Sequence, residues 1–343
     1  MLRIDADAHV LETEETWKYM AGPDLKFRPD IVGSVNENGS TDQYWLVDGT
    51  LRLKSRNVGK DTPLESRELR DVATRLKHMD ELKVDIQVIF PTIFIIPLTN
   101  RPEIELALCR SYNQWMGECW KQSQNRLRWV AMVPLLETDH VHEEAKAAKA
   151  NGAVGIYMRG SEGDRLLSDP HFFPIYQAGC DLDLPVCIHS SNGSATLYDY
   201  YKRETVGFSR FKLVCVGAFH TVVMDKIPER FPKLKMAFLE IGSQWLPYAL
   251  SDLNKRAHLQ GKEFDGKSLL QDNRIWVGCE SNDDLPYIIE KAGEDYLVVG
   301  TDYGHADSAT ELMALDGISE KPGLAPDLVD KIIGGNAQAL YNL

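Results

Sequence analysis

The chain has 343 residues, of which 43% are hydrophobic, and this length fits either two domains or one large barrel. Its formal net charge of −13, without a Lys/Arg run, argues against a nucleic-acid partner, because such binding needs a clustered basic face. No stretch of about 18 apolar residues is present, so we expect no membrane span. The N-terminus lacks a basic segment before an apolar run, and the six cysteines lack a CxxC spacing. We therefore expect a cytoplasmic enzyme with reduced thiols.

Short β-branched runs alternate with longer helical segments along the chain. The strand-like runs are residues 2–8, 84–92, 127–134, 153–158, 184–189, 234–240, 274–280 and 296–302. Helical patterns fill most of the gaps, as at residues 102–122 and 140–151. This alternation predicts parallel strands with crossover helices, and its eight repeats predict an α/β fold of the (β/α)8 TIM-barrel type, with residues 1–343 as a single domain. The alternative is an open doubly wound sheet, but no GxGxxG follows the first strand.

One segment departs from this alternation. Residues 41–58 alternate polar and apolar side chains around Asp48-Gly49, which predicts a hairpin inserted after the first strand. The insertion is expected on the side of the barrel where the active-site loops gather. Two interpretations are open: a lid over the site, or a surface decoration. The acidic run at residues 12–15 is expected on an exposed face.

Asp5, Asp7 and His9 alternate along the first strand and therefore share one face. Burying two carboxylates and an imidazole together is costly unless something neutralises them. A divalent cation does so, because carboxylate oxygen and imidazole nitrogen are its natural ligands. The alternative is a hydrogen-bonded Asp–His pair without metal. On the metal interpretation Asp7 and His9 bind the ion, with Asp5 beneath them as support.

Further metal-competent side chains fall at the carboxyl ends of later strands, where barrels carry their chemistry. His189 ends the fifth strand, Glu240 the sixth and Asp302 the eighth. The sequence therefore predicts one divalent ion bound by Asp7, His9, His189 and Asp302. Nitrogen and oxygen ligands suit both Zn²⁺ and Mn²⁺, and zinc is the first expectation, with manganese possible.

Four motifs carry a family resemblance over essentially the whole chain. They are IDADAH at residues 4–9, IH at 188–189, RFPKLKMAFLEIGSQWLPY at 230–248 and GTDYGH at 300–305. Together they resemble the amidohydrolase superfamily, and more closely the amidohydrolase-2 branch, which includes aminocarboxymuconate semialdehyde decarboxylase and γ-resorcylate decarboxylase. The resemblance implies the same four ligands. It also marks departures: the first ligand is usually His or Glu, and the sixth strand usually ends in His, where this chain has Asp7 and Glu240.

The resemblance implies a metal-dependent, non-oxidative decarboxylase of a small aromatic or unsaturated carboxylic acid, with no organic cofactor. The alternative is a metal-dependent hydrolase, in which water activated by the ion attacks an amide, ester or lactone. A remote alternative is an inactive binding or scaffold barrel. Asp302 is the predicted catalytic acid/base. Glu240 is the second candidate, or else a carboxylate that only orients a ligand.

The expected partner is a small carboxylic acid, and a homo-oligomer is compatible with the sequence. Arg159, at the end of the fourth strand, is predicted to clamp a substrate carboxylate, with an ion pair to Asp164 or Glu162 as the alternative. Arg52 on the hairpin is predicted to bind substrate in the same way. Trp245 is predicted to supply an aromatic wall, with core packing as its alternative.

Overall fold

A computed structural model describes residues 1–35, 41–54, 57–204, 207–262 and 264–343. Eight parallel strands form one sheet in the order β1-β5-β6-β7-β8-β9-β10-β11. Their bounds are β1 Ile4–Val10, β5 Ile86–Pro91, β6 Leu127–Ala131, β7 Ala153–Arg159, β8 Val186–His189, β9 Met236–Leu239, β10 Ile275–Cys279 and β11 Leu297–Val299. Each lies within or overlaps one of the eight predicted runs.

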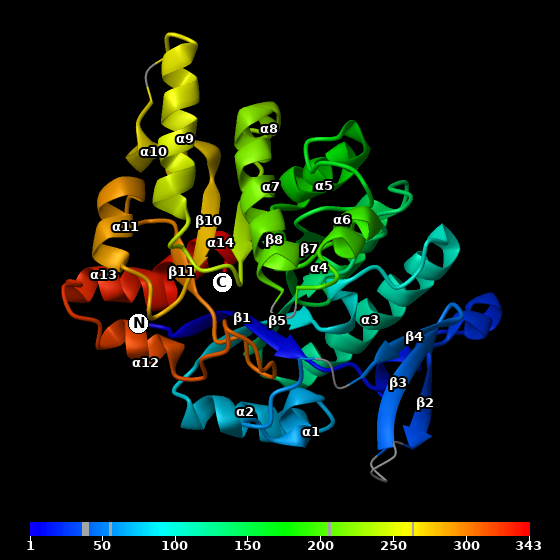
Figure 1. Ribbon diagram of the computed structural model, residues 1–343. Coiled ribbons are helices and arrows are strands. Elements are labelled where there is room, and N and C mark those ends of the chain that lie inside the picture. The colour runs from blue at the N-terminus through cyan, green and yellow to red at the C-terminus, as the bar shows by residue number, and fades with distance from the viewer. Residues whose placement is uncertain (36–40, 55–56, 205–206, 263) are drawn as a thin grey trace.

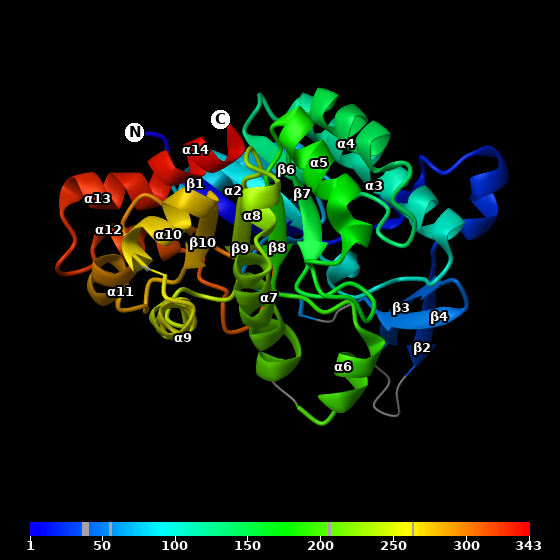
Figure 2. The same ribbon diagram turned by 90° about the horizontal axis from the view of Figure 1, so that it is seen from above.

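Hydrogen bonds between the first strand and the segment after the last bring the two edges of the sheet together. The Asp302 N–H donates to the Asp7 carbonyl at 2.9 Å, and the His9 N–H donates to the Tyr303 carbonyl at 2.9 Å. The strands therefore form a nearly closed barrel, and the predicted (β/α)8 architecture is confirmed. Figures 1 and 2 show the helices surrounding this barrel.

The helices pack their apolar faces against the strands. Their bounds are α1 Leu64–Arg67, α2 Val72–Glu81, α3 Pro102–Gln122, α4 Val141–Ala150, α5 Phe173–Leu182, α6 Ala195–Tyr200, α7 Leu213–Met224, α8 Ile227–Arg230, α9 Leu246–Leu259, α10 Gly266–Asn273, α11 Leu285–Ala292, α12 Ala314–Ser319, α13 Pro326–Asp330 and α14 Asn336–Tyr341. Short 3-10 turns are η1 Glu14–Trp17, η2 Gly22–Phe27, η3 Ile93–Ile95 and η4 Pro170–Phe172, and two π-helices are η5 Phe208–Lys212 and η6 Lys331–Gly335. None of the described helices is long and apolar enough to cross a membrane.

The insertion after β1 forms a small antiparallel sheet of its own. β3 (Thr41–Val47) pairs with β4 (Thr50–Leu53) around Asp48 and Gly49, which have φ of +46° and +74°. A third strand, β2 (Asp30–Val35), pairs with β3 and was not predicted. The sheet projects from one side of the barrel (Figure 1). Residues 55 and 56 of the predicted hairpin segment lie outside the described residues.

Gly300, just after β11, allows the two edge strands to approach each other. A Cβ atom built on Gly300 would lie 2.5 Å from the Asp7 Cβ and 3.0 Å from the Asp7 carbonyl oxygen. We therefore expect Gly300→Ala to lower the free energy of unfolding by about 1–3 kcal/mol, because the strands must separate.

Gly217 in α7 is the matched control for this substitution. An added Cβ there meets no atom within 4 Å. Gly217→Ala should raise the free energy of unfolding by about 0.5–1 kcal/mol, because alanine restricts the unfolded chain and favours the helix. Urea denaturation measures both changes, and equal effects at the two positions would contradict the close-approach argument.

Candidate metal centre

Three of the predicted ligands meet inside the carboxyl end of the barrel. Asp7 and His9 come from β1, His189 is the last residue of β8, and all three are buried. The Nε2 atoms of the two histidines lie 3.0 Å apart. Asp7 Oδ1 lies 3.7 Å from the His9 Nε2 and 3.5 Å from the His189 Nε2. The alternation read from the first strand thus places Asp7 and His9 beside His189.

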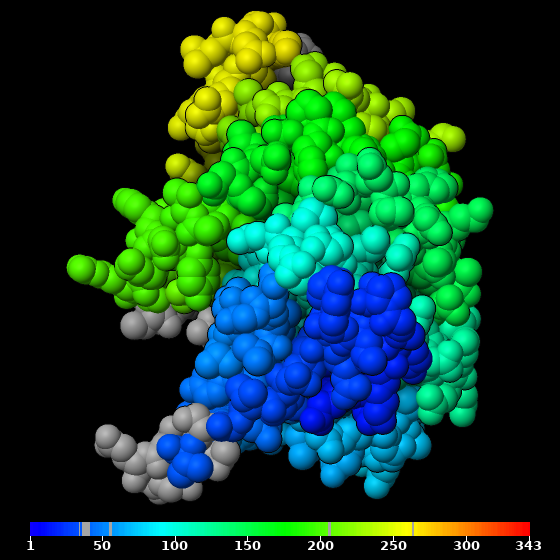
Figure 3. All heavy atoms as spheres, turned by 90° about the vertical axis from the view of Figure 1, so that its right-hand side faces the viewer, coloured from blue at the N-terminus to red at the C-terminus, as the bar shows by residue number. Residues whose placement is uncertain are grey.

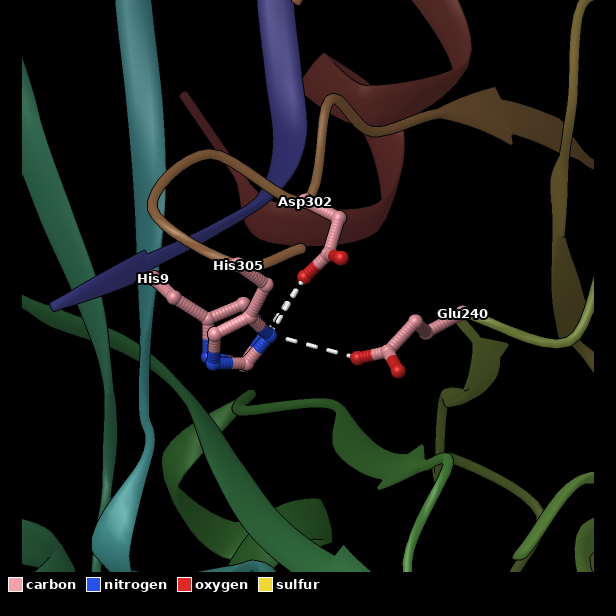
Figure 4. Close-up of side chains that lie close together, drawn as sticks. All are labelled: His9, Glu240, Asp302 and His305. Atoms are coloured by element: carbon pink, nitrogen blue, oxygen red, sulfur yellow. Dashed lines mark ion pairs between the residues drawn. The ribbon is translucent and has the colours of Figure 1, made fainter. Parts of the chain in front are cut away.

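Two more carboxylates and a third imidazole surround the same point. Glu240 Oε2 lies 2.6 Å from the His189 Nε2 and 3.4 Å from the His9 Nε2. Asp302 Oδ1 lies 3.4 Å from the His9 Nε2 and 2.7 Å from the His305 Nδ1. Figure 4 shows Glu240 and Asp302 pointing toward the stacked imidazoles of His9 and His305. We call Asp7, His9, His189, Glu240, Asp302 and His305 the metal cluster.

Glu240 and Asp302 both have left-handed backbone conformations, with φ of +59° and +49°. Glu240 directly follows β9, and Asp302 follows β11 after two intervening residues, so both left-handed residues lie in the bend after a strand. Such a conformation costs about 1–3 kcal/mol in a residue other than glycine and is concentrated at functional sites.

The side chains of the cluster fit a divalent cation. Asp7 Oδ1, Glu240 Oε2 and Asp302 Oδ1 are buried, and each faces an imidazole nitrogen of the cluster, without a hydrogen bond of good geometry among the described residues. Buried carboxylate oxygens without partners are costly, and here they converge with imidazole nitrogens. Nitrogen and oxygen donors in this number satisfy a transition-metal ion. The site is thus suited to one divalent metal, and its chemistry does not separate zinc from manganese.

Proton affinities in the cluster reflect this crowding. Burial lowers the pKa of His9 well below its ordinary value, and the neighbouring His305 and His189 lower it further. This direction favours the neutral imidazole, which is the form that binds a metal. Burial also raises the pKa of the Asp302 carboxyl well above its ordinary value.

Hydrogen bonds from outside the cluster fix the orientation of its members. The His9 Nδ1 lies 3.1 Å from the Pro91 carbonyl, so it carries the proton and leaves the Nε2 lone pair for the ion. Asp302 Oδ2 accepts a hydrogen bond from the Thr310 hydroxyl at 2.6 Å. The His305 Nε2 lies 2.9 Å from the Thr92 hydroxyl oxygen. These partners restrain the cluster before any ion binds.

A buried polar network lies behind the first strand. The Asp5 carboxylate accepts hydrogen bonds from the Thr301 N–H and the Gln87 amide, both at 2.9 Å. The Arg75 guanidinium is fully buried and donates to Gln87 Oε1 at 2.7 Å and to the His9 carbonyl at 3.2 Å. Asp5 therefore supports the strand from beneath. Arg75 and Gln87 were not identified from the sequence, because neither lies in a recognisable motif.

A cavity of about 1080 Å³ adjoins Glu240. The insertion contributes Trp45, Arg52 and Lys54 to its wall, which makes the insertion part of the site rather than a surface decoration. Figure 3 shows the α6 segment and the three-stranded sheet projecting to the same side, with a recess between them.

The predicted substrate-binding residues occupy different environments. Arg52 lines the cavity and donates to the Pro97 carbonyl at 2.9 Å. Arg159 is buried outside the cavity wall, in an ion pair with Glu162 at 2.6 Å, which was its alternative role. Trp245 packs against Phe219 at a centroid distance of 4.9 Å and also lies outside the wall. Substrate contacts of these three residues stay predictions.

Glu12 belongs to the cavity but was expected on an exposed face. Its carboxylate is buried and accepts hydrogen bonds from the Thr92 and Ile93 N–H groups, each at 3.0 Å. Burial raises the pKa of Glu12 to about 7. The expectation for Glu12 was wrong because the chain turns inward between β1 and η1. The acidic run at residues 12–15 has no periodic pattern from which this turn could be predicted.

Comparisons with known proteins agree with the fold and with the family resemblance. A 2-amino-3-carboxymuconate-6-semialdehyde decarboxylase of Dictyostelium discoideum is 23% identical, over 100% of this chain and 92% of its own length. The structure of the amidohydrolase map2389c from Mycobacterium avium subsp. paratuberculosis has a TM-score of 0.81 at 19% identity and covers 99% of each chain.

A second solved structure is a 5-carboxyvanillate decarboxylase of Novosphingobium aromaticivorans in complex with manganese and 4-hydroxy-3-methoxy-5-nitrobenzoic acid. It has a TM-score of 0.73 at 18% identity, covering 100% of this chain and 96% of its own. A family model described as amidohydrolase matches residues 4–343. The resemblance found in the sequence is confirmed, and the chain belongs to the amidohydrolase family of enzymes.

Proposed function

We propose that the protein is a metal-dependent, non-oxidative decarboxylase of an aromatic or unsaturated carboxylic acid. The observation that carries the proposal is the buried metal cluster beside a cavity with both apolar and cationic walls. The Dictyostelium relative, a decarboxylase by name, and the manganese-bound decarboxylase structure support it. Zinc as the ion, a cytoplasmic location, a homo-oligomer and a small carboxylic acid as substrate belong to the same proposal.

Asp7, His9, His189 and Asp302 would hold the ion, which supplies a positive charge that polarises a substrate oxygen. Asp302 would lie at the ion with its Oδ2 held by the Thr310 hydroxyl, where its carboxylate is placed to pass a proton between water and substrate. The substrate C–C bond breaks, its electron pair stays on the ring or alkene carbon, and CO2 leaves. Asp302 or Glu240 then gives a proton to that carbon. The apolar wall favours the neutral product CO2 over the charged carboxylate.

Hydrolysis of an amide, ester or lactone is the second candidate, because the same ligands can activate water and the family description is amidohydrolase. The two reactions release different products. The metal-loaded protein should be incubated with a panel of hydroxybenzoates and unsaturated acids labelled at the carboxyl carbon, and in parallel with esters, amides and lactones.

We expect labelled CO2 from at least one acid, and none after the metal is chelated. Acid release from the second panel alone would replace the decarboxylase by a hydrolase. A protein that holds a full equivalent of metal but turns over neither panel would favour the inactive barrel.

A further inference from the structure

The cavity is large for a single-ring acid. Its volume of about 1080 Å³ lies at the upper end of the roughly 300–1,000 Å³ usual for sites that bury drug-sized ligands. Its walls come from both sides of the recess: from the insertion after β1 and from η5, the π-helix between α6 and α7. A substrate that fills the cavity therefore extends from the metal cluster toward η5.

Arg210 is the central residue of η5 and lines the cavity. Its guanidinium carbon lies 4.9 Å from the ring centroid of Tyr198 and 5.0 Å from that of Phe211. Two aromatic neighbours restrict the side chain, so less entropy is lost when a ligand binds it. Short π-helical segments are rare in proteins, and those that occur often lie at functional sites.

Arg210 differs from the lysines of the cavity in its partners. Lys212 lies 3.2 Å from a Glu280 carboxylate oxygen, and Lys54 lies 3.3 Å from one of Glu68. Within the described part of the chain, no carboxylate lies within 4 Å of the Arg210 guanidinium, and its buried Nε has no hydrogen-bond partner there. The acidic group beside Arg210 is Glu204, whose carboxylate accepts a hydrogen bond from the Arg210 backbone N–H at 2.9 Å and forms no ion pair within 4 Å of the guanidinium. In a protein with a net charge of −13, a cation at a cavity wall whose guanidinium is not in such an ion pair is suited to an anionic ligand.

We propose that Arg210 binds a second anionic group of the substrate at the η5 wall of the cavity. The substrate class is then an extended acid: one carboxylate reaches the metal cluster, an apolar body contacts the walls, and a distal carboxylate or phenolate pairs with Arg210. The inference rests on the proposed function only in placing a carboxylate at the metal cluster. It does not depend on which reaction follows.

Binding measurements test this without turnover. The probes are salicylates whose 5-position carries a chain of one to four methylene groups, ending either in a carboxylate or in a carboxamide. Calorimetry on the manganese-loaded protein gives Kd for each pair. For the best chain length, we expect the carboxylate to bind at least 10-fold more tightly than the carboxamide.

Three variants locate the origin of this preference. Arg210→Gln should abolish it, and Arg210→Lys should restore part of it, because the charge returns without the planar fork. Arg203→Gln is the matched control, since it removes one positive charge from an exposed side chain of the same segment that does not line the cavity. An equal preference in folded Arg210→Gln, or none at any chain length in the unmodified protein, would overturn the assignment. A protein that shows the preference but releases no CO2 would contradict only the proposed function.

Discussion

Replacing His189 with alanine is expected to weaken the binding of a divalent metal by more than about 100-fold, while the barrel stays folded. Loss of a hydrogen-bond partner outside the ligands already costs about 10- to 100-fold in affinity, and loss of a ligand costs more. His189 ends β8 with its Nε2 at 3.0 Å from the His9 Nε2 and 2.6 Å from Glu240 Oε2, so it lies at the centre of the cluster. Elemental analysis after dialysis, together with circular dichroism, measures both expectations.

His258→Ala is the matched control for this experiment. His258 is exposed near the end of α9 and does not belong to the metal cluster. The control variant should keep the full metal content of the unmodified protein. A full equivalent of tightly bound metal in His189→Ala would remove His189 from the ligand set, and with it the main argument for the cluster.

The fold was predictable because its signals are local and repeated. Each barrel strand appears in the sequence as a short apolar run between helical segments, and α3 begins and ends at the predicted residues 102 and 122. The strand β2 was missed because a six-residue strand with Gly33 in the middle has weak β-propensity. It forms by pairing with β3, which is a tertiary contact.

The site was predictable to the extent that it lies at strand ends. Asp7, His9, His189 and Asp302 follow from the rule that barrel chemistry gathers at the carboxyl face. The structure brings Asp7 and His189 together with His9, and it brings Asp302 to the other side of His9. Arg75 and Glu12 could not be found in this way, because their positions depend on how a helix and a turn pack against the barrel. For Arg159 the sequence left two roles open, because a strand-end position does not decide whether a side chain enters the cavity or pairs with a neighbour such as Glu162.

A substitution at Glu240 is expected to cause a large loss of catalytic activity. Glu240→Gln keeps the shape of the side chain but removes its charge and its ability to give and take a proton as a carboxyl. If Glu240 moves a proton in the reaction, kcat should fall by about 10²–10⁴-fold, the usual contribution of a general acid or base. We expect this loss with a full equivalent of metal still bound. Loss of metal together with activity would instead make Glu240 a ligand, a role that its position 2.6 Å from the His189 Nε2 also permits.

Glu240→Gly separates the role of the Glu240 side chain in the reaction from the strain of its backbone conformation. The φ of +59° at Glu240 is unfavourable for a side chain, so glycine should raise the free energy of unfolding of the metal-free protein by about 1 kcal/mol while abolishing turnover. Lys226→Gly is the matched control, because Lys226 has a φ of +60° at an exposed position before α8. It should stabilise the protein by a similar amount without loss of activity. A destabilised Glu240→Gly would mean that the carboxylate holds the fold together, whereas a stabilised and inactive one would show that the strained conformation is maintained for the reaction.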